Sequence, residues 1–255
     1  MFIRARAFCS VVAVCVLFAG ALFVHAQNAG TKDAKAQASS SAPGSTPDFS
    51  GVWGRRPDRN IRYAGYGFAA EELPMTPWGL EKFKANKPSF GPHSVTDTND
   101  PAYDCYLPGF PRIYVHPTVF EFIPTPGRMV QLFEYDGFAR QIWTDGRQHF
   151  KIEDDSEQLY MGDSIGHWEG DTLVTDTANF NDKTWIDRAG HPHSDQLHVM
   201  ERIRRVDHNT LQIDMTIEDP KAYTRPIVTQ MIYQLRPNWH INEHACTDYP
   251  RPEQP

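Results

Sequence analysis

The stretch 196–218, QLHVMERIRRVDHNTLQIDMTIE, decides the fold of this chain. In its second half, apolar side chains recur at every second position, at Leu211, Ile213, Met215 and Ile217. This period is typical of a strand that buries one face and exposes the other. The turn residues DHN at 207–209 separate it from an earlier run with apolar residues at 197, 199 and 203. The stretch therefore predicts an antiparallel β-hairpin.

Further short apolar runs flank this hairpin, and turn residues separate them. Asp-Gly steps at 136–137 and 145–146 and a Gly-Asp step at 170–171 are strong hairpin signals. The predicted strands lie at 48–53, 119–123, 129–135, 138–144, 164–169, 172–178, 196–206, 210–218, 227–235 and 239–246. Short connections without intervening helices favour an all-β fold, either an antiparallel β-barrel or a strongly curved sandwich. The Gly51-Val52-Trp53 start is similar to the Gly-x-Trp start of lipocalin-like (calycin) barrels.

The first half of the chain, up to about residue 117, is rich in Pro, Gly and aromatic residues and has no regular period. We expect it to form an irregular wrap around the strands. One short helix is predicted over 76–87, because Thr76 is a good N-cap and Pro77 suits the first helical position.

The N-terminus predicts export. Arg4 and Arg6 precede an apolar run over 7–24, and a small residue suited to signal-peptide cleavage follows at Ala26. This pattern indicates a signal peptide over 1–26 that is cleaved near Ala26, with an uncleaved anchor as the alternative. The composition of 27–47 predicts a disordered linker. We expect a single β-barrel-like domain over 48–250, a disordered tail over 251–255, and a periplasmic or secreted location.

The charge of the chain limits its partners. The formal net charge is −7, and removing Arg4 and Arg6 with the signal peptide changes it to −9. Nucleic acids and anionic membranes bind cationic surfaces, so neither is expected as a partner. No later segment has the roughly twenty apolar residues that an integral membrane helix needs. A small-molecule ligand or substrate is the expected partner, and the sequence leaves the oligomeric state open.

Two cysteines, Cys105 and Cys246, follow the predicted signal peptide. In an oxidising compartment they predict one disulfide, which would tie an early loop to the last predicted strand. Closing such a long loop stabilises by roughly 4–5 kcal/mol in the chain-entropy model. Two buried free thiols are the alternative.

Three predicted strands each place a glutamate on an otherwise apolar face: Glu134, Glu201 and Glu243. A buried carboxylate must be paired, bind a cation or remain protonated. Glu201 is therefore predicted as an acid–base residue. His193 or His198 would be its proton partner, and Arg140 or Arg202 would hold developing negative charge. Solvent-facing strands or structural salt bridges explain the same pattern equally well.

A metal site is a second hypothesis. His191 and His193 lie one residue apart, and His198 and Glu201 follow, which resembles the ligands of cupin metal sites. The spacing differs from that of a cupin, however, so the favoured interpretation is a polar loop at the mouth of the barrel. The chain contains no glycine-rich phosphate loop and no nucleophile elbow. No cofactor is therefore expected, and a transition metal is the minority alternative.

Aromatic residues in the predicted strands favour a small-molecule pocket. By default such residues belong to the core, but a barrel of this strand number is large enough to hold one small ligand. A pocket needs an aromatic wall and a few convergent polar groups. The predicted ligand-binding residues are Trp143, Trp168, Tyr135, Arg147, His149 and His167.

The segments FEYDGFARQIWTDGRQHF, MGDSIGHWEGDTLVTDTANFNDKTW, GHPHSDQLHVMERIRR and IEDPKAYTRP give the chain a specific resemblance to a known group of proteins. From about Phe49 to Asp248 it resembles a broad family of secreted, β-rich proteins of environmental bacteria. The family has no established reaction. The resemblance therefore implies one exported β-rich domain and assigns no catalytic residue.

Three functional hypotheses follow. The first is an exported enzyme that uses Glu and His acid–base chemistry on a small hydrophobic or aromatic substrate, as an isomerase, lyase or hydrolase. The second is a non-catalytic, lipocalin-like ligand carrier. The third is an envelope protein whose wrapped first half is a partner surface. A His-ligated metal would turn the first into a metal-dependent enzyme, including an oxidoreductase.

Overall fold

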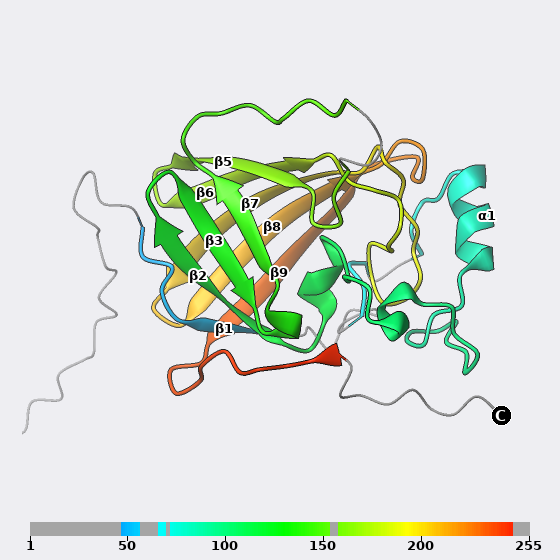
Figure 1. Cartoon of the computed structure of the whole chain (residues 1–255), viewed down its shortest axis with the longest axis horizontal. Helices are drawn as coiled ribbons and strands as arrows, with labels where there is room; N and C mark the ends of the chain where they lie inside the picture. The colour runs from blue at the N-terminus through cyan, green and yellow to red at the C-terminus, as the bar shows by residue number, and fades with distance from the viewer. Residues whose placement is uncertain (1–46, 57–65, 70–71, 154–157, 247–255) are drawn as a thin grey trace, which may run out of the picture. The chain divides into compact units, whose positions relative to one another are not determined.

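The hairpin predicted over 196–218 is present in the computed structural model as strands β7 (His198–Asp207) and β8 (Thr210–Glu218). The structure describes residues 47–56, 66–69, 72–153 and 158–246, which lie in one compact unit, Ala38–Pro255. Within them, nine strands form a closed barrel in chain order, with β9 pairing back to β1 (Figure 1). The other strands are β1 (Val52–Arg55), β2 (Val119–Thr125), β3 (Arg128–Phe133), β4 (Ala139–Trp143), β5 (Asp163–Glu169), β6 (Thr172–Ala178) and β9 (Ile227–Leu235). The all-β barrel prediction is confirmed.

Alternation along the strands places every second side chain inside the barrel. The four apolar residues predicted for the inner face of β8 are all buried. On β7 the inner face consists of Val199, Glu201 and Ile203, each fully buried. The side chains between them point outward, so a single strand supplies residues to both faces of the barrel wall.

The segment before β2 does more than wrap the barrel. The 3-10 helix η2 (Arg112–Val115) is entirely buried. Its Ile113, Tyr114 and Val115 belong to the same hydrophobic cluster as the inward residues of the strands. This part of the irregular first half therefore supplies core, because its apolar residues have no other surface to cover.

The short helix is present as α1 (Pro77–Ala85), and the Thr76 hydroxyl caps it by accepting from the Gly79 backbone amide at 3.1 Å. Thr76 also donates from its hydroxyl to the Lys221 carbonyl oxygen at 2.6 Å, which fixes the helix against the turn after β8. Two further 3-10 helices are η1 (Pro101–Asp104) and η3 (Tyr135–Gly137). Among the described residues, no helix is long and apolar enough to cross a membrane.

One predicted connection is wrong. After the Asp-Gly step at 145–146 the chain does not return as a hairpin, and β5 pairs with β4 in parallel instead. Two residue pairs, Ile142 with Ser164 and Trp143 with Ile165, make up this junction. After the turn only Phe150 and Ile152 alternate with polar residues, and the acidic run EDDSE at 153–157 follows, so the segment offers little apolar face for a return strand. The barrel is therefore mixed rather than purely antiparallel.

The last predicted strand, 239–246, is also wrong, because this segment is irregular. Both edges of β9 are already occupied by β8 and β1, so the closed barrel offers no edge for another strand. The segment is held instead by the predicted disulfide between Cys105 and Cys246, whose Cα atoms lie 5.6 Å apart. The signal peptide predicted over 1–26, most of the linker over 27–47 and the tail over 251–255 lie outside the described residues.

Candidate functional site

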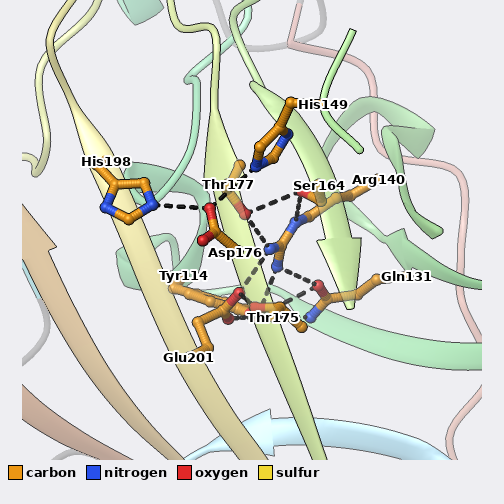
Figure 2. A network of polar contacts seen from close by, with 10 residues as sticks. All are labelled: Tyr114, Gln131, Arg140, His149, Ser164, Thr175, Asp176, Thr177, His198 and Glu201. Atoms are coloured by element: carbon orange, nitrogen blue, oxygen red, sulfur yellow. Dashed lines mark hydrogen bonds and ion pairs between the residues drawn. The ribbon is translucent and has the colours of Figure 1, made fainter. Parts of the chain in front are cut away.

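Glu201 lies in a polar network inside the barrel (Figure 2). Its side chain is fully buried, and its two oxygens accept three hydrogen bonds. Oε1 accepts from the Tyr114 hydroxyl at 2.8 Å. Oε2 accepts from Arg140 Nη2 at 2.5 Å and from the Thr175 hydroxyl at 2.6 Å. The glutamate expected on the apolar face of β7 is therefore buried and paired with an arginine.

Arg140 extends this network across four neighbouring strands. From β4, its Nε donates to the Ser164 hydroxyl on β5 at 2.9 Å. Its Nη2 donates to the Thr177 hydroxyl on β6 at 2.8 Å as well as to Glu201 on β7. Its Nη1 faces Gln131 Oε1 at 3.4 Å. All three nitrogens of Arg140 thus have acceptors, as a buried guanidinium requires.

The Tyr114 hydroxyl completes the pairing of Glu201. Burial raises the pKa of Tyr114 well above its ordinary value, and the charge of Glu201 raises it further, against the opposite effect of Arg140. Tyr114 therefore remains protonated and donates its hydrogen bond. Both oxygens of Glu201 and every nitrogen of Arg140 are thus engaged, and the interior network links neighbouring strands.

A second polar group lies on the outer face of the same strands. On β6, Thr175 and Thr177 point into the barrel and Asp176 points out (Figure 2). Asp176 Oδ1 lies 2.7 Å from His198 Nε2 and 3.0 Å from His149 Nε2. None of the described residues donates a hydrogen bond to the other oxygen, Oδ2. Asp176 is therefore held through one oxygen, and its side chain is 44% exposed.

His149 is held between two carboxylates. Its Nδ1 lies 2.9 Å from Asp163 Oδ2, and its Nε2 is the atom that contacts Asp176. Partial burial alone lowers the pKa of His149, but the hydrogen bonds and charges of Asp163 and Asp176 outweigh burial and raise it. Conversely, partial burial raises the pKa of Asp176, and the two histidines more than offset this and lower it. His149 therefore favours the doubly protonated ring, and Asp176 favours the carboxylate.

The protonation of His198 follows from its partners. Because Asp176 is a carboxylate, the contact at His198 Nε2 requires a proton on that nitrogen. In the neutral ring the lone pair is then on Nδ1, which lies 3.8 Å from Glu218 Oε2. The His198 side chain is 32% exposed, so part of the ring is open to the solvent beside the outer face of β7.

Asp176 also lines a depression of about 540 Å³ on the outer face. Two rows of paired residues cross its floor. One row runs Ile165, Asp176, Met200, Thr216 and Val228, and the other runs His167, Val174, Arg202, Asp214 and Gln230. All of these except Gln230 line the depression, together with Gly146, Arg147 and Gln148 from the loop after β4. The lining combines exposed apolar side chains with both signs of charge.

The structure separates the predicted site residues into groups. Glu201 and Arg140 meet inside the barrel, whereas Arg147, His167 and Arg202 line the outer depression, and His149 and His198 adjoin it through Asp176. The remaining aromatic residues lie elsewhere. Trp143 packs under Arg147 and Arg128, Trp168 contacts Phe49, and Tyr135 contacts His116.

Glu134 and Glu243 are not on an inner face. The buried side chains of β3 are Met129, Gln131 and Phe133, so Glu134 follows the outward positions. Trp239 Nε1 donates to Glu134 Oε1 at 3.3 Å. Glu243 is exposed in the irregular C-terminal segment. Apolar residues occupy both faces of β3, which is why alternation gave the wrong face for Glu134.

The histidines of the metal hypothesis point to three different partners. His191 Nδ1 lies 2.7 Å from Asp187 Oδ2, and His193 Nε2 lies 2.7 Å from the Thr184 hydroxyl. Both rings are buried, whereas His198 lies on the outer face with Asp176. Within the described part of the chain, no group of three or more His, Cys, Asp or Glu side chains is arranged to hold a metal ion.

Sequence reasoning missed Asp163 and Asp176. Each lies at an outward position of its strand, and the β6–β7 register places Asp176 opposite Met200, next to the position of His198. The density of acidic and histidine residues over 161–202 was the available signal. That density does not by itself single out Asp163 and Asp176. Their importance becomes visible only from the register of three strands and the path of the loop that carries His149. Comparison with protein-family models and with curated proteins gave no match to this chain.

Proposed function

We propose that the protein is an exported enzyme that binds a small, partly hydrophobic molecule in the outer depression and transfers protons on it. The observation that carries this proposal is the position of Asp176, which lines the depression and contacts both His149 and His198. A carboxylate that orients a histidine beside a ligand-sized depression is the arrangement that general acid–base catalysis uses.

Each residue of the group has a role in this proposal. Asp176 holds His198 in the tautomer that carries its lone pair on Nδ1, and stabilises the ring when Nδ1 takes a proton from the bound molecule. His149, fixed by Asp163, orients Asp176. The same Nδ1 returns the proton at another atom of the molecule in an isomerisation or elimination, or activates water in a hydrolysis.

The depression indicates the class of molecule. Ile165, Val174, Met200 and Val228 give it an apolar floor. Arg147 and Arg202 supply positive charge, and Asp214 supplies negative charge. A small aromatic or aliphatic molecule with a carbonyl or carboxylate group matches this combination, because the apolar part covers the floor and the polar group meets an arginine.

Glu201 takes a structural role in this proposal. Its oxygens are occupied by Tyr114, Arg140 and Thr175, and it is fully buried. We therefore assign the acid–base role, which the sequence predicted for Glu201, to Asp176 and His198 on the outer face of the barrel wall. The carrier hypothesis uses the same depression without proton transfer and becomes one outcome of the test.

Proton exchange with the solvent tests the proposal without knowledge of the natural reaction. The full chain is incubated in D2O with small aryl ketones and 2-oxo acids, and deuterium at the carbon next to the carbonyl is followed by NMR. 4-Nitrophenyl acetate serves as the hydrolysis probe. General acid–base groups contribute about 10²–10⁴-fold, so the rate of His198→Gln should fall by about that factor. Ligand-observed NMR should still show binding.

The matched control is His208→Gln, because His208 is an exposed histidine in the turn between β7 and β8. This variant should keep the activity. If the wild type binds the probes without proton exchange, and His198→Gln binds them equally well, the carrier hypothesis is supported instead. If Met200→Arg, which fills the depression, leaves both binding and exchange unchanged, the depression is not the site and the proposal fails.

A further inference from the structure

A group of cationic side chains lies away from the outer depression, around the buried 3-10 helix η2. Arg112 begins η2 and is 1% exposed, and His116 follows η2 and is 7% exposed. Arg188 comes from the loop between β6 and β7 and is half-buried. Trp185, from the same loop as Arg188, has its ring centre 5.3 Å from the Arg112 guanidinium, so this loop packs against η2.

The local charges do not balance. Arg112 Nη2 pairs with Asp100 Oδ2 at 2.5 Å, and both side chains are 2% exposed. Arg188 has no carboxylate within ion-pair distance among the described residues, and its guanidinium lies 3.5 Å from the ring centre of Phe90. Two guanidinium groups therefore share a single paired carboxylate in a largely dry environment, although the chain as a whole is acidic.

Buried hydrogen-bond donors in this group lack acceptors. Among the described residues, nothing accepts from Arg112 Nε or Nη1, and His116 Nε2 has no hydrogen-bond partner. Leaving one buried polar group unsatisfied costs about 1–3 kcal/mol, and more when the group is charged. Three such atoms around one excess positive charge are complementary to an oxyanion, which supplies acceptors and negative charge together.

The titration behaviour of the group agrees with an uncompensated positive charge. Burial and, after it, the charge of Arg112 together lower the pKa of Arg188 to about 10, against the opposite effect of Asp100. Burial also lowers the pKa of His116 well below its ordinary value, and Arg112 and Arg188 act in the same direction. The negative charge of a bound anion would act in the opposite direction and raise the pKa of both Arg188 and His116.

We propose that Arg112, Arg188 and His116 form a binding site for a small oxyanion, a carboxylate or a phosphate. Arg112 and His116 donate from the buried side. Arg188 closes the site toward the solvent, because Phe90 beneath its guanidinium is 39% exposed. Trp185, whose ring centre lies 5.3 Å from the Arg112 guanidinium, forms part of the wall. The site shares no residue with the outer depression.

Calorimetric titration of the full chain tests this site. Sodium acetate, sodium benzoate and inorganic phosphate are titrated separately, with chloride holding the ionic strength constant. The variant is Arg188→Met, which keeps the side-chain stem and removes the half-buried charge. The matched control is Arg204→Met, which removes an exposed arginine on the outer face of β7. Circular dichroism in chloride buffer shows whether each variant is folded.

At least one of the three anions should bind to the wild-type chain with 1:1 stoichiometry. Loss of a charge-assisted contact corresponds to about a tenfold or greater loss of affinity, so Arg188→Met should show it and Arg204→Met should not. Preference for acetate or benzoate over phosphate would identify the ligand as a carboxylate, and the reverse would identify a phosphate. The proposal is overturned if none of the anions binds, or if Arg188→Met binds them as the wild type does.

Discussion

Replacing Glu201 by glutamine tests whether the interior network holds the barrel together. Arg140 and Glu201 are 1% and 0% exposed and lie 2.5 Å apart. The variant therefore leaves a guanidinium charge inside the barrel without its carboxylate. Breaking a buried ion pair from one side costs about 3–5 kcal/mol. A domain of this size loses roughly 2–4 °C in Tm per kcal/mol, so we expect Tm to fall by roughly 6–20 °C.

The assay is thermal unfolding followed by circular dichroism at pH 7, with Arg140→Met and the double variant completing a cycle. The double variant should lose about 2 kcal/mol less stability than the sum of the two single variants, because it leaves no unpaired charge inside the barrel. At a temperature where it is folded, Glu201→Gln should also retain the proton exchange proposed for the outer face. A loss below about 1 kcal/mol, the usual value for an exposed pair, would refute the reasoning.

Three further predictions concern other parts of the fold. Gly79→Ala should lower the free energy of unfolding in urea by about 1–3 kcal/mol, because the new Cβ would lie 2.2 Å from the Ala222 carbonyl oxygen. This loss is expected although alanine favours helices more than glycine does. The control, Lys84→Ala on the same helix, should be nearly neutral. Cys246→Ser, which opens a disulfide with a sequence separation of 141, should cost about 5 kcal/mol in the same assay. Burial lowers the pKa of His193, so its neutral ring stabilises the fold fully above about pH 6.5, and this contribution is lost as pH falls through the lowered pKa. Tm measured from pH 7.5 to 4.5 should therefore fall less steeply in His193→Gln than in the wild type.

The strands that sequence reasoning located best are those with one clearly apolar face. On β8 every inward residue is apolar and every outward residue is polar, so alternation alone fixes both the strand and its orientation. On β3, Val130 and Leu132 are apolar but face outward, and Gln131 is polar but buried. Alternation then has no unique solution, because the outer face is partly covered and the inner face belongs to a polar network.

The parallel junction and the irregular C-terminal segment depend on closure of the barrel. A turn signal such as Asp145-Gly146 describes only the local reversal of the chain and does not choose the partner of the next strand. Likewise, the apolar residues of 239–246 fit a strand pattern, but pairing of β9 with β1 removes the edge on which that strand would form. Local pattern cannot encode a long-range closure of this kind.

Sequence reasoning found only part of the candidate site, again because some of its residues show no local signal. Glu201 stood out because a carboxylate among Leu197, Val199 and Ile203 demands a partner, and Arg140 was a candidate from its apolar surroundings. Asp176 gave no such signal, because an acidic residue at an outward position is ordinary on a protein surface. Its significance arises only from the side chains that the register and the loop bring to it.

Strand β6 connects the two networks, because Thr175 and Thr177 point into the barrel and Asp176 points out (Figure 2). A slip of β6 by one residue against β7 would exchange these faces and bury Asp176 beside Glu201. Two buried carboxylates sharing the single charge of Arg140 would repel each other, so this register is unfavourable. The interior pair therefore favours the register that brings Asp176 to His198. The strongest signal in the sequence, a glutamate on an apolar face, accordingly lies one side-chain layer away from the groups that we propose act on a ligand.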